Sequence, residues 1–111
     1  MNRMVLFLVV GLLALAACSC GASVTVRNES SAEVQDVRVD GRCFAEKIGQ
    51  LAPGASRSIR VKPCGESGIR TKFTTGGVAR ETPELGYIED SSSYSVTLAI
   101  QADFTVRDFV R

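Results

Sequence analysis

The sequence predicts an all-β fold, a single antiparallel β-sandwich of about seven strands that follows a cleaved signal peptide. Three observations predict it. Beyond residue 22 the apolar side chains recur with a period of two, which is the period of a strand, and no stretch carries the apolar stripe of a helix. Clusters of Gly, Pro, Asn, Asp and Ser separate the alternating runs. The chain has 111 residues, enough for one domain, and many short half-apolar strands bury their apolar sides best as two packed sheets.

Residues 1–17 predict an export signal rather than a part of the domain. Arg3 supplies positive charge near the amino terminus, and an apolar run then extends from Val5 to Ala17. A membrane-spanning helix needs about 20 apolar residues, so a run of this length is typical of a cleaved signal peptide. The run has no polar stripe that would give a folded helix a solvent face. We therefore expect residues 1–17 to be absent from the mature protein.

The segment Leu15-Ala16-Ala17-Cys18 resembles the lipobox of bacterial lipoproteins, in which an aliphatic residue and two small residues precede a cysteine. The resemblance covers residues 1–18. It implies cleavage before Cys18, a diacylglycerol thioether on its sulfur, and an acyl chain such as palmitate on its amine. Two or three such chains hold a protein stably on a membrane. Ordinary signal peptidase cleavage after Ala14-Leu15-Ala16 is the alternative.

Ser19 and the short stretch after it predict where the domain is held. By the sorting tendency of proteobacterial lipoproteins, Ser19 in place of Asp favours the periplasmic face of the outer membrane. Residues 18–22 are expected to form the lipidated tether and residues 23–111 the β-sandwich domain. Since each tether residue spans at most about 3.5 Å, the domain is expected to lie against the lipid headgroups.

The first three alternating runs predict the strands of the amino-terminal half. Val24 and Val26 alternate with polar residues in the run 24–27. Val37 and Val39 do the same in the run 36–39, and the run 58–62 follows after a gap that contains Pro53-Gly54. Turn-forming residues separate these runs, as expected for short strands. These separators are Asn28-Glu29-Ser30-Ser31, Asp40-Gly41 and Pro53-Gly54.

Three further runs predict the strands of the carboxy-terminal half. They cover residues 69–74, 94–100 and 104–110. The run 94–100 has the cleanest alternation, because every large apolar residue is followed by a polar or small one. The separators are Pro63-Cys64-Gly65, Gly76-Gly77 and Gln101-Ala102-Asp103.

The stretch from Ile48 to Ser56 resembles a turn common in bacterial immunoglobulin-like and fibronectin-like domains. In those domains a Pro-Gly pair, here Pro53-Gly54, joins two strands. The resemblance implies an immunoglobulin-like sandwich with a strand on each side of the pair. It concerns the architecture and carries no information about a ligand.

The four cysteines predict one disulfide in an oxidising compartment. Export permits disulfides, and a lipidated Cys18 leaves three thiols. Cys43 and Cys64 lie within the domain, whereas Cys20 lies two residues from the lipid. We therefore expect the pair Cys43–Cys64. Metal-binding cysteines usually form closely spaced pairs and often work with His, which this chain lacks, so we expect neither a metal nor another cofactor.

Composition argues against an enzyme and against a nucleic-acid partner. Thirteen Lys and Arg face twelve Asp and Glu, and the net charge of +1 gives no bulk attraction to a polyanion. The absence of His removes the commonest general base, so no catalytic residues are expected. Glu89 and Asp90 are adjacent, whereas a glycosidase needs two carboxylates on opposite sides of a cleft. A polar loop is the simpler interpretation of that pair.

Four cations predict a possible contact surface. Alternation places Arg60 and Lys62 outward on one strand, and Arg70 and Lys72 outward on the next. If the two strands form a hairpin, all four share one solvent face that could contact anionic lipid. The alternative is a pair of solvated strands whose Lys and Arg side chains prevent edge-to-edge aggregation.

Together these features predict a membrane-anchored lipoprotein of the bacterial envelope that acts as a non-enzymatic interaction or scaffold module. Its expected partners are the membrane, reached through the lipid on Cys18, and either another envelope protein or an anionic lipid surface. One alternative is an accessory lipoprotein subunit of a secretion system or another envelope machine. The other alternative, from a different class, is an envelope hydrolase.

Overall fold

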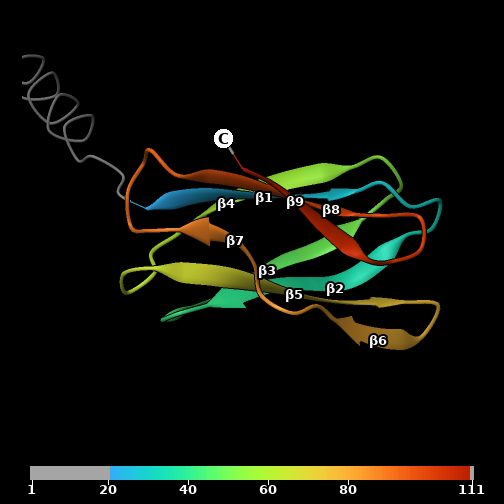
Figure 1. Ribbon diagram of the computed structural model, residues 1–111. Helices are drawn as coiled ribbons and strands as arrows, with labels where there is room; N and C mark the ends of the chain where they lie inside the picture. The colour runs from blue at the N-terminus through green and yellow to red at the C-terminus, as the bar shows by residue number, and fades with distance from the viewer. Residues whose placement is uncertain (1–20, 111) are drawn as a thin grey trace, which may run out of the picture.

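The computed structural model describes residues 21–110, which form a sandwich of two β-sheets (Figure 1). Sheet A has the strand order β4-β1-β8-β9, and sheet B has the order β3-β2-β5-β6, with β7 pairing with β5. The strands are β1 Ala22–Asn28, β2 Val34–Gly41, β3 Phe44–Leu51, β4 Ser56–Val61, β5 Ser67–Thr75, β6 Val78–Glu81, β7 Leu85–Ile88, β8 Ser95–Ile100 and β9 Val106–Val110. Within this range no helix is long and apolar enough to cross a membrane.

The predicted all-β sandwich is confirmed, with three differences of detail among residues 21–110. Nine strands form instead of about seven. One neighbouring pair is parallel, because β1 and β8 run in the same direction while every other pair is antiparallel. The first strand also begins at Ala22, a residue expected to belong to the tether, and Ala22 already pairs with Val61 of β4.

The core lies between the sheets and follows from the pleat of the strands. In β1 the side chains of Val24 and Val26 are fully buried, and those of Ser23 and Thr25 on the opposite side are partly exposed. The same alternation in β8 buries Val96, Leu98 and Ile100, which point toward sheet B. The largest fully buried side chains are Leu51, Ile69, Ile88, Leu98, Ile100, Val24, Val26, Val34, Val37, Val39, Val61 and Val96.

A β-bulge in β2 explains why Val34 and Val37 are both buried although they are three residues apart. The register of β2 against β3 shifts between these valines, and Asp36 between them has a positive φ of 51°. An extra residue in one strand lets the side chains on both sides of it point to the same face. Asp tolerates the left-handed conformation better than most residues, so the bulge fits this position.

Asn28 ties the end of β1 to the opposite sheet. Its side chain is fully buried, and its Nδ2 donates to the carbonyl oxygens of Ala32 (2.8 Å) and Leu51 (3.0 Å). Its Oδ1 accepts from the amide and the hydroxyl of Ser30, at 3.0 and 2.6 Å. Its backbone amide donates to Ala55, and its carbonyl accepts from Gly54. Because all its polar atoms are paired, Asn28 joins β1 to the β3–β4 connection without a desolvation penalty.

The expected Pro53-Gly54 turn is present, and it connects β3 of sheet B to β4 of sheet A. Gly54 has a positive φ of 80°, which glycine adopts without steric cost. The turn therefore moves the chain from one layer of the sandwich to the other.

Thr71 places an unpaired hydroxyl in the core. Its backbone is held by Thr82, whose hydroxyl accepts from the Thr71 amide at 3.0 Å and whose amide donates to the Thr71 carbonyl at 2.9 Å. The side chain of Thr71 is fully buried, and its Oγ1 has no hydrogen-bond partner among the described residues. An unmatched buried hydroxyl costs about 1 kcal/mol or more.

The substitution Thr71→Val is therefore expected to raise the free energy of unfolding by about 1 kcal/mol, because it replaces the hydroxyl with a methyl group of similar size. Urea denaturation followed by circular dichroism measures the change. The control Thr71→Ser keeps the hydroxyl and removes the methyl group, so it should lower stability by about 1 kcal/mol. A less stable Thr71→Val variant would contradict the prediction.

Candidate functional site: the arginine face of sheet A

The hairpin that was expected to gather four cations does not form. Arg60 lies in β4, which pairs with β1 in sheet A, and Lys62 follows the end of that strand. Arg70 and Lys72 lie in β5, which pairs with β2 in sheet B. The expectation of one shared face was wrong because the chain changes layers between β4 and β5. The two pairs of cations belong to different sheets.

Carboxylates accompany the cations on the outer face of sheet B. Lys72 Nζ lies 3.4 Å from Asp40 Oδ2. Arg70 Nε lies 3.5 Å from Glu81 Oε1. Both pairs are well exposed, and such pairs contribute little to stability, but they neutralise much of the charge. This face is therefore a mixed-charge surface.

The outer face of sheet A differs, because none of the outward-facing side chains that the structure describes on its four strands is acidic. We call this surface the arginine face. Register and alternation place small hydroxyl residues over its centre, arginines around them and one aromatic ring on β9. The arginine face consists of Ser23, Thr25, Arg27, Ser56, Ser58, Arg60, Ser95, Thr97, Ala99, Arg107 and Phe109.

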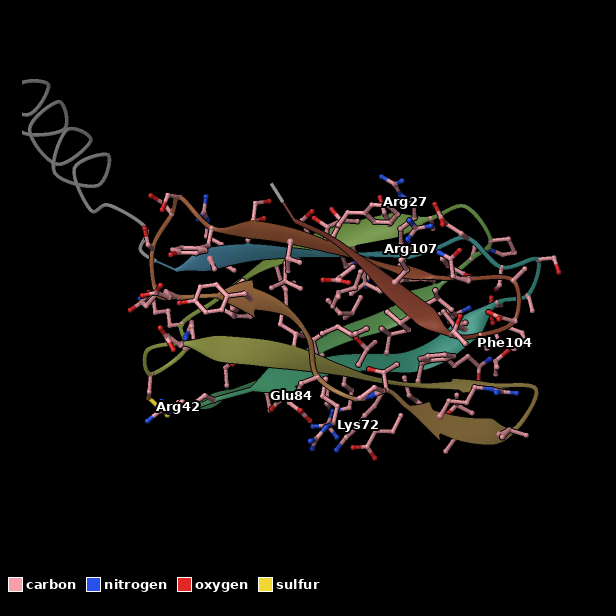
Figure 2. The ribbon with its side chains drawn as sticks, viewed as in Figure 1. Arg27, Arg42, Lys72, Glu84, Phe104 and Arg107 are labelled. Carbon is pink, nitrogen blue, oxygen red and sulfur yellow. A yellow bond between two sulfur atoms is a disulfide. The ribbon has the colours of Figure 1, made fainter. Side chains whose placement is uncertain are left out.

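Arg27 and Arg107 flank a buried alanine on the arginine face. Ala99 of β8 pairs with Arg27 of β1 on one side and with Arg107 of β9 on the other. Figure 2 shows both arginines on the outer side of sheet A. Ala99 points outward yet is fully buried, because long side chains at the flanking positions cover so small a residue. Glu29, just after β1, brings a carboxylate to the rim, 3.7 Å from Arg27 Nη1.

Phe109 gives the arginine face an exposed apolar group. Its side chain is 44% exposed, and the guanidinium carbon of Arg107 lies 5.3 Å from the centre of its ring. Thr25 and Ser58 share a hydrogen bond of 2.6 Å between their hydroxyls. Aromatic and arginine side chains are the residues that most often dominate binding surfaces, and hydroxyls add adaptable hydrogen bonds.

Sequence reasoning missed Arg27, Arg107 and Phe109 as members of one surface. Their alternation alone indicates that each points away from the core. It does not show that β1 and β9 lie in the same sheet, on either side of β8. That information comes from strand pairings between distant parts of the chain.

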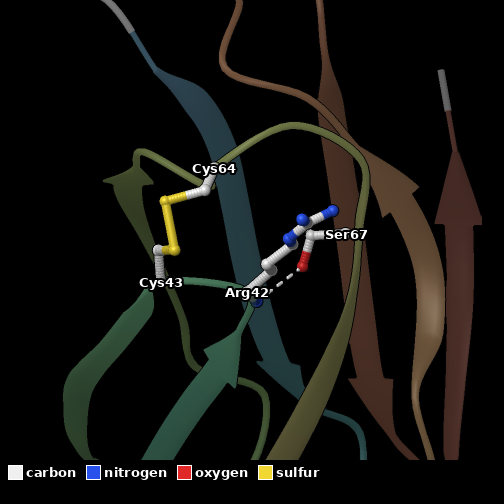
Figure 3. The surroundings of a disulfide bond; sticks show 4 residues. All are labelled: Arg42, Cys43, Cys64 and Ser67. Carbon is white, nitrogen blue, oxygen red and sulfur yellow. Dashed lines mark hydrogen bonds between the residues drawn. A yellow bond between two sulfur atoms is a disulfide. The ribbon is translucent and has the colours of Figure 1, made fainter.

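The predicted disulfide Cys43–Cys64 is confirmed, with a Cα–Cα distance of 5.6 Å (Figure 3). Cys43 lies in the turn between β2 and β3, and Cys64 lies in the crossover from β4 to β5. The Cys64 amide donates to the Arg42 carbonyl (3.2 Å), and the Arg42 amide donates to the Ser67 hydroxyl (2.9 Å). The bridge therefore joins the β2–β3 hairpin of sheet B to the segment that arrives from sheet A. Cys18 and Cys20 lie outside the described residues.

Removal of the bridge in a Cys43→Ala, Cys64→Ala variant is expected to lower the free energy of unfolding by about 3 kcal/mol. The bridge closes a loop with a sequence separation of 21, and its loss gives the unfolded chain more freedom. Urea denaturation of the oxidised protein and of the variant measures the difference. Reduction of the unsubstituted protein should produce a similar loss. An unchanged denaturation midpoint in both cases would show that the bridge contributes nothing.

A carboxylate and two phenols close the loop between β7 and β8. Glu89 Oε2 accepts from the hydroxyl of Tyr87 at 2.6 Å and from that of Tyr94 at 2.8 Å. The two rings lie 5.8 Å apart and are tilted. The hydrogen bond from Tyr87, and to a smaller extent that from Tyr94, lowers the pKa of Glu89. The same hydrogen bonds to Glu89 raise the pKa of both phenols. The expected polar loop at Glu89-Asp90 is thus an ordered turn.

A groove lies at the open side of the sandwich, between the β6–β7 connection and the start of β9. Its volume is about 460 Å³, and its wall includes Leu85, Phe104 and Val106. Arg80 also lines it, with its guanidinium carbon 4.9 Å from the centre of the Phe104 ring.

No group of three or more potential metal ligands occurs among residues 21–110.

The Tyr87→Phe substitution is expected to raise the pKa of Glu89 toward its usual value, because it removes the stronger of the two phenol donors. Because the pKa of Glu89 is lower in the folded protein than in the unfolded chain, its ionised carboxylate stabilises the fold at pH values above the unfolded pKa. That contribution is lost as the pH falls through the folded value. The variant should therefore lose less stability on acidification. Carboxyl NMR titration measures the pKa, and identical titration curves for Glu89 in both proteins would refute the assignment.

Comparisons with known proteins give likeness in fold alone. No protein-family model matches the chain, and no curated protein matches it. The NMR structure of a protein from Eubacterium rectale is similar with a TM-score of 0.58 and 14% identity, over 81% of this chain and 87% of that one. The N-terminal domain of AlgF from P. aeruginosa superimposes with a TM-score of 0.49 and 17% identity, over 85% of this chain and 98% of that one. The chain is a small all-β domain with solved structural neighbours.

Proposed function

We propose that the chain is a lipid-anchored protein of the bacterial envelope whose β-sandwich is a non-enzymatic interaction or scaffold module. We further propose that Cys18 carries the lipid and that the domain lies on the periplasmic side of the outer membrane. The observation that carries the proposal is the segment Leu15-Ala16-Ala17-Cys18 at the end of an apolar run, followed almost at once by β1.

The start of β1 supports a membrane-proximal position for the domain. Ala22 is the first residue of the strand, four residues after Cys18, so the tether reaches at most about 14 Å from the modified cysteine. Ala22 is fully buried and paired with β4, which fixes the folded end of the tether. A module held this closely acts at the membrane surface rather than at a distance from it.

The disulfide supports an oxidising compartment. Cys43–Cys64 joins two segments of a small domain, and disulfides persist mainly in exported proteins. The arginine face supports an interaction role, because it places three arginines and an exposed Phe109 on one side of sheet A. Both features are expected of an exported module that binds through one of its faces.

Mass spectrometry of the protein purified from envelopes is expected to find Cys18 at the amino terminus with a diacylglycerol group and an additional acyl chain. The Cys18→Ser variant should remain uncleaved or lose its acyl chains, and it should leave the detergent phase in which the lipidated protein collects. The matched control Cys20→Ser should keep the lipid, because only Cys18 follows the aliphatic and small residues of the motif. An unmodified amino terminus at another residue would reject the proposal.

A further inference from the structure

The two outer faces of the sandwich differ in how their cations are compensated. On sheet B, Lys72 and Arg70 each have a carboxylate partner within 3.5 Å, and Arg38 and Lys47 add two further cations beside Asp40 and Glu81. On the arginine face the outward-facing strand residues that the structure describes include three arginines and no acid, and within residues 21–110 the carboxylate that pairs with one of them, Glu29, lies on the rim. The outward strand residues of the arginine face therefore carry positive charge alone, whereas those of sheet B carry both signs.

The arrangement of the cations matches a flat, extended partner. Arg27 and Arg107 lie two strand spacings apart, about 10 Å, and point to the same side. Arg60 lies on the same face at the other end of β1, nearer the anchor, where its Nη1 donates to the carbonyl of Gly21 at 3.2 Å. The charges thus extend along the whole strand that follows the tether.

We propose that the arginine face lies on the anionic headgroup surface of the bilayer that holds the acyl chains. This inference rests on the lipid anchor proposed above. The guanidinium groups of Arg27, Arg60 and Arg107 would pair with headgroup phosphate oxygens, which arginine binds in a bidentate way. The hydroxyls of Ser and Thr on the face donate hydrogen bonds to the same layer, and Phe109 contacts its apolar boundary.

A lipid surface is favoured over an acidic protein because the anchor enters the domain through this sheet. β1 occupies an inner position of sheet A, and the short segment before it keeps the end of the face that carries Arg60 close to the headgroups, from which the face can tilt onto the bilayer. Each cation near an anionic membrane contributes about as much as a weak specific contact, so three of them are enough to orient a domain that is already anchored.

Three exposed apolar residues provide reporters for the orientation, because the chain contains no Trp. Phe109→Trp reports on the arginine face, Tyr87→Trp on the loop end near the anchor and Val78→Trp on β6 of sheet B. The parent side chains are 44%, 41% and 53% exposed, so each position has room for a larger ring. Tyr87→Trp also removes the hydrogen bond to Glu89, so its fold is compared with that of Tyr87→Phe by circular dichroism.

The experiment uses the mature lipoprotein extracted from envelopes and reconstituted in vesicles with brominated acyl chains. One set of vesicles contains phosphatidylcholine alone, and the other also contains phosphatidylglycerol. Tryptophan at position 109 should be quenched and shifted to shorter wavelength with phosphatidylglycerol only, and this quenching should weaken as salt rises. Tryptophan at position 78 should be unaffected in both.

A pair of matched charge variants tests the role of the arginines. Arg27→Gln with Arg107→Gln removes two cations from the arginine face, whereas Arg38→Gln with Lys47→Gln removes two from sheet B. In the first variant, the ratio of domains whose arginine face lies on the bilayer to domains whose face does not should fall about thirtyfold. This corresponds to about 2 kcal/mol for the loss of two charges. The second should change the quenching at position 109 little.

The results separate this inference from the lipid anchor. Failure to sediment with phosphatidylcholine vesicles would count against the anchor, since acyl chains bind both vesicle types. Sedimentation with both, but equal quenching at positions 109 and 78, would overturn the inference alone. Quenching at position 87 without quenching at 109 would indicate an end-on domain and would overturn it as well. Unchanged quenching at position 109 in the Arg27 and Arg107 variant would have the same consequence.

Discussion

The structure depends on the place of β1 within sheet A. This strand pairs with β4 on one side and with β8 on the other, and its inward valines form part of the core. Because the pleat alternates, burial of Val24 and Val26 determines that Ser23, Thr25 and Arg27 face away from the core. The first strand of the sandwich therefore also sets the chemistry of the outer face of sheet A.

Two links between the layers keep that arrangement fixed. The buried side chain of Asn28 joins the end of β1 to the carbonyl of Leu51 in sheet B. At the other end of the sandwich, Cys43–Cys64 joins the β2–β3 turn to the crossover that follows β4. One link is a set of hydrogen bonds and the other is covalent, and each lies where the chain passes between sheets. A domain of this size gains much of its stability from such connections.

The sequence predicts the core strands better than the edges. Alternation is clear in β1 and β8, which are buried on one side along their whole length. It is obscured in β3, where an irregularity in the pairing with β2 leaves Ile48 and Leu51 buried three residues apart. The strand β6 is exposed throughout, so its residues carry no apolar pattern at all. The sequence alone therefore leaves β3 and β6 without a periodic signal.

The cation surface shows a different limit. Alternation predicts correctly that Arg60 points away from the core, as it does for Arg70. Whether two such residues share a face depends on which strands pair, and the crossover between β4 and β5 separates these two. The disulfide was predictable because Cys18 and Cys20 lie close to the apolar run at the amino terminus, whereas Cys43 and Cys64 lie within the predicted strands and turns of the domain. Sequence position thus identified the bridge, whereas the arginine face required the strand order.

Arginine footprinting of the unsubstituted protein, extracted from envelopes, tests the proposed orientation of the arginine face most directly. The purified protein in phosphatidylglycerol-containing vesicles, and the same protein in detergent, would be treated with an arginine-specific dicarbonyl reagent and analysed by mass spectrometry. If the arginine face lies on the headgroups, the vesicles protect Arg27 and Arg107 from the reagent, while Arg38 on sheet B reacts equally in vesicles and in detergent. Equal modification of Arg27, Arg107 and Arg38 in vesicles and in detergent would contradict that orientation.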